Sequence, residues 1–135
     1  MSHIAEIELE IKSLSALSRA AKRIGMKFVK GQKTFKWYGH TPGQCEHALT
    51  IPNNDNAYEV GVKKKGSAHE LLWDDFDPEL RRVVGRNGGL LKQAYGAEQT
   101  KEAAANMGLA VWESVDNETG KITLTLQESG GATLW

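Results

Sequence analysis

Hydrophobic and polar residues alternate along residues 3–11, where apolar side chains interleave with three glutamates. A period of two predicts an amphipathic strand with its glutamates in solvent. Apolar residues then recur at helical spacing over residues 14–24. Ser13 before this segment is a typical N-cap, and Gly25 after it is a typical helix stop. The chain is therefore expected to begin with a strand followed directly by a helix.

Alternation and turn residues predict further strands over residues 26–30, 33–38, 47–51, 58–65 and 69–74, with loops over 39–46 and 52–56. Asp77 followed by Pro78 predicts a capped helix. Two more helical stretches are expected on either side of Gly96, over residues 90–95 and 97–107. The chain is then expected to close with a hairpin of residues 109–115 and 121–127 around a DNETG turn.

This order of elements predicts an α+β fold. We expect one curved antiparallel sheet of about six to seven strands, helices packed on one of its faces, and a C-terminal hairpin. The length of 135 residues fits a single domain. We expect that domain to span residues 1–128 and residues 129–135 to form a flexible tail. Trp37, Trp73 and Trp112 are expected to pack in the core or at its edge.

The composition of the chain indicates the cellular compartment in which the protein works. No apolar run approaches the roughly 20 residues of a membrane span, and the first residues lack the plan of a signal peptide. The single cysteine, Cys45, excludes an internal disulfide. We therefore expect a cytoplasmic protein with no membrane partner.

The distribution of charged residues along the chain is more informative than the net charge. The chain balances 17 basic against 17 acidic residues, yet residues 11–45 contain eight Lys or Arg and no acid. Aromatic residues are interleaved with them. A neutral protein with one basic flank attracts anions locally. The sequence therefore predicts a partner rather than a reaction, and a binding protein rather than an enzyme.

We expect the basic segment to bind a phosphate-bearing ligand, a nucleotide or a nucleic acid, with an aromatic ring stacking on the base. The expected binding residues are Arg19, Arg23, Lys33, Lys36, Trp37, Tyr38, Lys63, Lys65 and Arg86. The alternative is that these lysines only solvate the outer faces of a helix and two strands. If about four side chains contact phosphate, the slope of log affinity against log salt is expected near −3 to −4.

Other chemistry has weaker support in the sequence. The stretch GRNGG at 85–89 lacks the Lys-Ser or Lys-Thr of a phosphate loop, although Arg86 and the amides that begin the next helix offer a place for an anion. His40, Cys45 and His47 lie close in sequence but have no fourth ligand at an obvious spacing. No acid–base or nucleophile constellation is visible, so we expect no catalytic residue, no metal and no cofactor.

Three segments carry a resemblance to a known family: the start MSHI, the central YEVGVKKKGSAHELLWDDF and the final YGAEQTKEAAANMGLAVWESVDNETGKITLTLQ. Together they resemble the family of hypothetical chloroplast reading frame 35, a domain of unknown function (1257) of cyanobacteria, plastids and other microbial genomes. Gly96 and the C-terminal ESGGATLW depart from its pattern. The resemblance implies a fold and a cytoplasmic setting and brings no activity. It also implies an AAA-type ATPase as a companion.

The alternative function is therefore a protein-interaction adaptor or an oligomeric accessory protein that partners such an ATPase. The basic and acidic zones of the chain would also allow pairing between copies.

Overall fold

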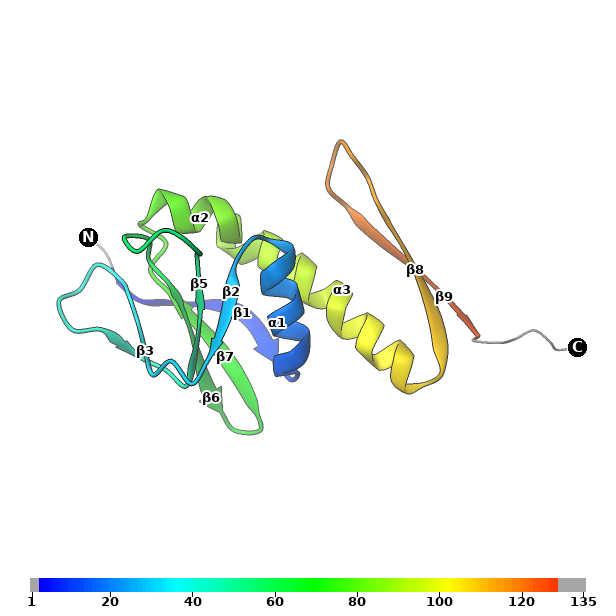
Figure 1. The fold of residues 1–135 in the computed structure, drawn as a ribbon, viewed down its shortest axis with the longest axis horizontal. Coiled ribbons are helices and arrows are strands. Elements are labelled where there is room, and N and C mark those ends of the chain that lie inside the picture. Colours follow the sequence, from blue (N-terminus) through cyan, green and yellow to red (C-terminus); the bar gives the residue numbers. More distant parts are fainter. Residues whose placement is uncertain (1–2, 129–135) are drawn as a thin grey trace, which may run out of the picture.

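The structure is a computed structural model that describes residues 3–128. The elements follow in the order β1 (Ala5–Ile11), α1 (Leu14–Arg23), β2 (Lys27–Lys30), β3 (Thr34–Phe35), β4 (Gly43–Gln44), β5 (His47–Thr50), β6 (Val60–Lys65), β7 (Ala68–Trp73), α2 (Pro78–Val84), a 3₁₀ turn η1 (Arg86–Gly88), α3 (Gly89–Asn106), β8 (Leu109–Val115) and β9 (Ile122–Glu128). Helix α1 lies between β1 and β2 in the chain, α2 and α3 follow β7, and Figure 1 shows α1, α2 and α3 beside the sheet.

Five strands form the central antiparallel sheet in the order β1-β7-β6-β5-β2. The tight β6–β7 hairpin turns at Gly66, which has a φ of +64° that favours glycine. β1 and β2 are the two edges, because α1 carries the chain from one side of the sheet to the other.

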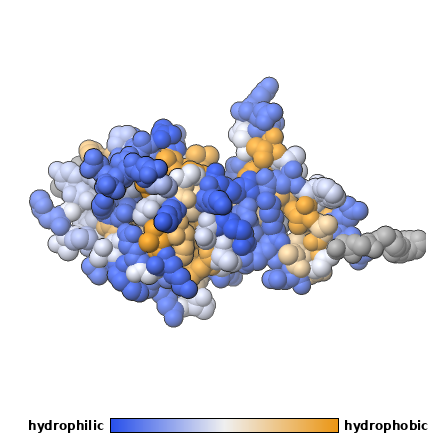
Figure 2. All heavy atoms as spheres, viewed as in Figure 1, coloured by the Kyte–Doolittle hydropathy of each residue, from blue (hydrophilic) through white to orange (hydrophobic). Residues whose placement is uncertain are grey.

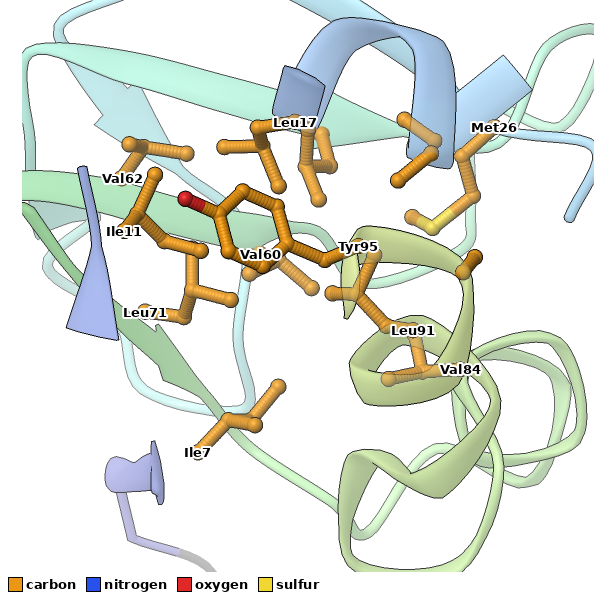
Figure 3. Close-up of a cluster of buried hydrophobic side chains, with 14 of the residues drawn as sticks. Ile7, Ile11, Leu17, Met26, Val60, Val62, Leu71, Val84, Leu91 and Tyr95 are labelled. Atoms are coloured by element: carbon orange, nitrogen blue, oxygen red, sulfur yellow. The ribbon is translucent and has the colours of Figure 1, made fainter. Parts of the chain in front are cut away.

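The main core lies between one face of this sheet and the three helices. Alternate strand residues such as Val60 and Leu71 are fully buried there against Leu17 of α1 and Leu91 of α3. Figure 3 shows the ring of Tyr95 among these side chains. Its hydroxyl accepts hydrogen bonds from the backbone N–H groups of Lys12 (2.9 Å) and Ser13 (3.2 Å). Tyr95 thus joins α3 to the junction between β1 and α1.

Within residues 3–128, the opposite face of the sheet is covered mainly by the small β3–β4 pair. Phe35 of β3 is buried against Ala48 and Leu72, whose side chains point away from the helices. The ring lies directly over Gly61 of β6, where a Cβ atom would come within 2.3 Å of it. A glycine is therefore required at position 61 for this close approach.

The last two strands stand apart from the central sheet. β8 and β9 form their own two-stranded sheet, in which Val111 pairs with Leu126 and Val115 with Ile122. Figure 1 shows this hairpin beyond α3, clear of the five central strands. Gln93 of α3 donates a hydrogen bond to the carbonyl of Gly120 in the hairpin turn (2.6 Å), so the hairpin runs back along α3.

The α+β class, the antiparallel sheet, the helices on one face and the C-terminal hairpin are confirmed. The central sheet has five strands, because the other four strands form two separate pairs. The strand predicted over 33–38 shortens to β3, and the predicted 39–46 loop contains β4. The expected tail, residues 129–135, lies outside the described residues. Within residues 3–128, no helix is long and apolar enough to cross a membrane.

The predicted break at Gly96 is wrong, since α3 runs through it without interruption. Glycine weakens a helix by roughly 1 kcal/mol relative to alanine but does not end it when the neighbouring turns are packed. Buried Tyr95 and Ala97 provide that packing on either side.

Gly96→Ala is expected to raise the free energy of unfolding by about 0.5–1 kcal/mol. Nothing lies within 4 Å of the Cβ that the substitution adds, and Gly96 is helical. Urea denaturation followed by circular dichroism measures the change. Gly88→Ala is the matched control and is expected to destabilise, because its φ is +75° and its Cβ would meet Ile7 at 2.6 Å. Destabilisation by Gly96→Ala would contradict the packing of α3 described above.

Candidate functional site

A network of ion pairs fastens the C-terminal hairpin to the helices. Arg23 of α1 contacts both carboxylate oxygens of Glu113 in β8, at 2.8 and 3.0 Å. The same guanidinium contacts Glu98 of α3 at 2.8 Å, and Lys101 reaches Glu113 at 2.6 Å. We call the following six residues the ion-pair network: Arg19, Arg23, Glu98, Lys101, Glu102 and Glu113. Because Glu113 lies on β8, this network sets the position of the hairpin relative to α1 and α3.

The other end of the ion-pair network ties α3 to the start of α1. Glu102 accepts hydrogen bonds from the hydroxyls of Ser13 and Ser15, both at 2.6 Å, and contacts Arg19 at 2.8 Å. Ser13 is the N-cap of α1, as predicted, since its hydroxyl accepts a bond from the N–H of Ala16. The first turn of α1 is thus anchored to α3.

These contacts shift the acid–base properties of the network. Hydrogen bonds from Ser13, Ser15 and Arg19 lower the pKa of Glu102 to about 2, and bonds from Arg23 and Lys101 lower the pKa of Glu113 to about 2. Burial raises the pKa of Glu98, but hydrogen bonds from the two arginines outweigh burial, so its pKa is lowered. All three carboxylates are therefore ionised at neutral pH, each facing at least one cation.

Acid is expected to destabilise the protein through these carboxylates. The pKa of Glu102 and Glu113 falls from 4.5 to about 2 on folding, so their contribution to stability is present above pH 4.5 and is lost as the pH falls toward 2. His47 adds a loss at higher pH. Burial, and then the neighbouring His69, lower its folded pKa below 6.5, so stability also declines as the pH falls below 6.5.

Urea denaturation at a series of pH values between 7 and 2 measures this loss. Glu113→Gln is expected to lower stability at pH 7 and to flatten the decline below pH 4.5. Glu118→Gln makes the same change of charge in the hairpin turn and is expected to show the same dependence of stability on pH as the parent protein. Equal profiles for the two variants would show that Glu113 does not stabilise the fold through its charge.

The hairpin itself exposes apolar side chains. The row of Val111, Val115, Ile122, Leu124 and Leu126 faces α3, yet Val115 and Leu126 stay nearly half exposed. Trp112 lies on the outer face, 63% exposed, with its indole N–H bonded to Gln127 (3.1 Å). Figure 2 shows apolar residues on this hairpin where it stands clear of the sheet. The prediction that Trp112 packs in the core or at its edge is wrong, whereas Trp73 is buried as expected.

Arg19 and Arg23 lie on the helix-covered side of the molecule. Their partners are the glutamates of the ion-pair network, which follow them in the chain by 75 to 90 residues. The structure therefore separates them from Trp37, which packs with Phe35 on the opposite face of the sheet. Sequence reasoning missed these partners, since only the tertiary fold brings α1, α3 and β8 together.

Lys33, Lys36, Trp37 and Tyr38 lie just before and just after β3 in the chain. Lys36 lines a polar hollow of about 350 Å³ together with Lys27, Gln32, Asn53 and Asn54, among other residues. The ammonium group of Lys36 donates a hydrogen bond to the carbonyl of Asp55. The backbone N–H of Lys36 donates a second bond, 2.9 Å long, to the carboxylate of Glu59, which also lines the hollow. An adjoining hollow of about 440 Å³ is lined by Trp37. The indole N–H of Trp37 bonds the carbonyl of Thr41 (2.7 Å), while Tyr38 is largely exposed.

The remaining predicted binding residues lie elsewhere. Lys63 and Lys65 are on β6, on the same face of the sheet as Phe35, and Lys65 lies 3.5 Å from Glu70 and 3.9 Å from Glu6. Arg86 is in η1, where Asn87 and Gly88 take positive φ and α3 begins at Gly89. The structure thus places Lys36 and Trp37 on adjoining hollows, which Lys33 and Tyr38 do not line, and places Arg86 on a different segment.

Polar residues that resemble metal ligands serve the backbone instead. Asp77 caps α2 by accepting from the N–H of Glu79 and also bonds the N–H of Tyr58. The buried Asp74 accepts from the N–H groups of Tyr38 and Phe76. The thiol of Cys45 donates a hydrogen bond to the carbonyl of Gln32, and burial raises the pKa of this thiol. In the part of the chain described, no three His, Cys, Asp or Glu side chains group as a metal site.

The fold and these surfaces define a small α+β protein that displays a separate C-terminal hairpin. The family model "Protein of unknown function (DUF1257)" matches residues 20–125, so the chain belongs to that family, as the sequence resemblance indicates. The chain is also similar to "Uncharacterized protein ycf35" of Cyanophora paradoxa, with 24% identity over 127 residues that cover 94% of this chain and 97% of the relative. No solved structure matches the chain.

Proposed function

We propose that this protein is a non-enzymatic, cytoplasmic protein-interaction adaptor that binds its partner through the β8–β9 hairpin. The observation that carries the proposal is the exposure of Trp112, Val115 and Leu126 on an element that the ion-pair network holds in place. Tryptophan is enriched among the residues that dominate binding energy at protein interfaces. The family resemblance adds an AAA-type ATPase as a candidate partner.

Rigid presentation supports this role. A hairpin of two strands is marginally stable alone, so its shape depends on what it packs against. Here Glu113 anchors its middle to Arg23 and Lys101, and Gln93 anchors its turn. A preorganised element loses less entropy on binding than a mobile one.

Affinity capture with the full chain as bait tests the adaptor proposal. The variant Trp112→Ala/Leu126→Ala is expected to lose a partner that the parent chain retains. The matched control is Tyr38→Ala/Phe76→Ala, which removes two comparably exposed aromatic side chains from another surface. Retention of every partner by the hairpin variant, or an equal loss in both variants, would contradict the proposal.

A second candidate function is binding of a phosphate-bearing ligand, a nucleotide or a nucleic acid, on the face that carries β3. The placement of Lys36 and Trp37 on two adjoining hollows, with Lys33 and Tyr38 next to them in the chain, favours it. Lys63 has no ion pair within residues 3–128 and faces the same side of the sheet. Arg19 and Arg23 are left out of this version of the site, because their guanidinium groups are engaged by the ion-pair network.

A thermal-shift screen with mono-, di- and cyclic nucleotides and short DNA and RNA tests this candidate. A ligand at about 100 times its Kd adds roughly 2.7 kcal/mol to the stability of the folded protein. The shift is expected to disappear in Lys33→Ala/Lys36→Ala and to persist in Lys92→Ala/Lys121→Ala. With three phosphate contacts, log affinity is expected to fall with log salt at a slope of about −2 to −3. A screen with no hit would remove this candidate.

A further inference from the structure

The outer edge of β9 is open and lacks the protection that natural edge strands usually carry. In the part of the chain that the structure describes, β9 pairs only with β8. Exposed edges are normally blunted by lysine, proline or a bulge, because free N–H and C=O groups invite another strand. Residues 122–127, ITLTLQ, contain no charge, no proline and no glycine.

The sequence of β9 is symmetrical about Leu124. Thr123 and Thr125 flank it, and Ile122 and Leu126 follow on either side. A two-fold interface requires such self-complementarity, because residue i meets residue j of the second copy while j meets i. An antiparallel pairing centred on Leu124 sets Thr123 opposite the second copy's Thr125, and cross-strand threonine pairs stabilise a sheet.

The charges at the ends of β9 fit the same pairing. Lys121 precedes the strand and Glu128 ends it. In an antiparallel arrangement centred on Leu124, Lys121 of each copy lies opposite Gln127 of the other and Glu128 lies opposite Gly120, so no like charges are directly opposed. β8 is less suited, since its Glu113 is already bound by Arg23 and Lys101.

We propose that β9 is the interface to a second copy of this chain. Two β9 strands pair antiparallel about Leu124 and join two hairpins into one four-stranded sheet. The half-exposed Leu126 is then covered by the second copy's Ile122 on the α3-facing side. This inference deepens the proposed function and rests on it, because the hairpin remains the interacting element and the first partner it binds is its own copy.

Light scattering after size-exclusion chromatography, over a series of protein concentrations, tests the pairing. The full chain is expected to approach twice 14.9 kDa as concentration rises. Thr123→Lys/Thr125→Lys sets lysines opposite each other across the two-fold axis and is expected to stay at 14.9 kDa. Both threonines are exposed in the single chain, so the variant is expected to fold.

Ser114→Lys/Asn117→Lys is the matched control. It adds the same charge to exposed positions of the same hairpin, away from the edge of β9, and is expected to dimerise. A parent chain that stays monomeric at every concentration overturns the proposal, and so does dimerisation of the Thr123→Lys/Thr125→Lys variant.

Cross-linking tests the register. Leu124→Cys places a thiol opposite its own image and is expected to form a disulfide-linked dimer under mild oxidation, whereas Thr123→Cys alone is not. Cys45 is buried and does not contribute. Cross-linking of Thr123→Cys without cross-linking of Leu124→Cys contradicts the pairing about Leu124.

Failure of the adaptor proposal and failure of the β9 pairing give different experimental results. Affinity capture reports on binding of a different protein, and light scattering of the parent chain reports on self-association. A monomeric chain that still captures a partner through Trp112 removes only the β9 pairing. A dimer that captures nothing removes only the adaptor role.

Discussion

Tyr95→Ala is expected to lower the free energy of unfolding by about 3–5 kcal/mol, the range seen when a large buried ring is removed. Tyr95 is 1% exposed and lies within the main core. It also provides the only described acceptor for the N–H groups of Lys12 and Ser13 at the junction of β1 and α1. Its removal thus leaves both a cavity and two unpaired donors. Urea denaturation followed by circular dichroism measures the change.

Tyr95→Phe separates the two contributions. It keeps the ring and removes the hydroxyl, so a loss of about 1–3 kcal/mol is expected from the unpaired N–H groups. Tyr38→Phe removes a hydroxyl from a largely exposed ring and is expected to change stability by less than about 0.5 kcal/mol. If Tyr95→Phe were as neutral as Tyr38→Phe, the hydroxyl would not hold the β1–α1 junction.

Phe35→Ala is the second large change, with an expected loss of about 3–5 kcal/mol. Phe35 is 1% exposed and is the central side chain of the small core under β3 and β4. The β3–β4 pair is only two residues long on each strand, and the buried ring packs it against the sheet. A smaller loss, near that of a surface substitution, would contradict this role.

A double-mutant cycle with Gly61 tests the close approach of the ring. Gly61→Ala alone is expected to cost about 1–3 kcal/mol, because its Cβ would lie 2.3 Å from the ring. In the Phe35→Ala background the same substitution is expected to cost less, since the clash is gone. Additive losses in the double variant would show that Phe35 does not lie against Gly61.

The local elements of the fold were predictable from sequence because local signals specify them. Alternation in β1, β6 and β7, the caps Ser13 and Asp77, and the DNETG turn all act over a few residues. The break predicted at Gly96 failed because tertiary packing overrides the weak helix propensity of one glycine. The length predicted for β3 failed because only Thr34 and Phe35 find a pairing partner.

The candidate site was less predictable, since it depends on contacts between distant segments. The absence of acids among residues 11–45 indicated a free basic surface, yet the partners of Arg23 are Glu98 and Glu113 on α3 and β8. The sequence predicts Trp112 in the core or at its edge, but its hairpin has no second layer on that face within residues 3–128. Lys36 and Trp37 do lie on adjoining hollows, because they are neighbours in the chain.

Amide hydrogen exchange of β9, at low and at high protein concentration, tests the role of the hairpin most directly. Half of the amides of residues 122–127 point toward β8 and the other half toward the open edge. If β9 is the interacting edge, the edge-facing amides exchange quickly at low concentration and become protected at high concentration, while the β8-facing amides are protected throughout. Edge-facing amides that exchange quickly at every concentration, with or without a captured partner, would contradict an interaction through this edge.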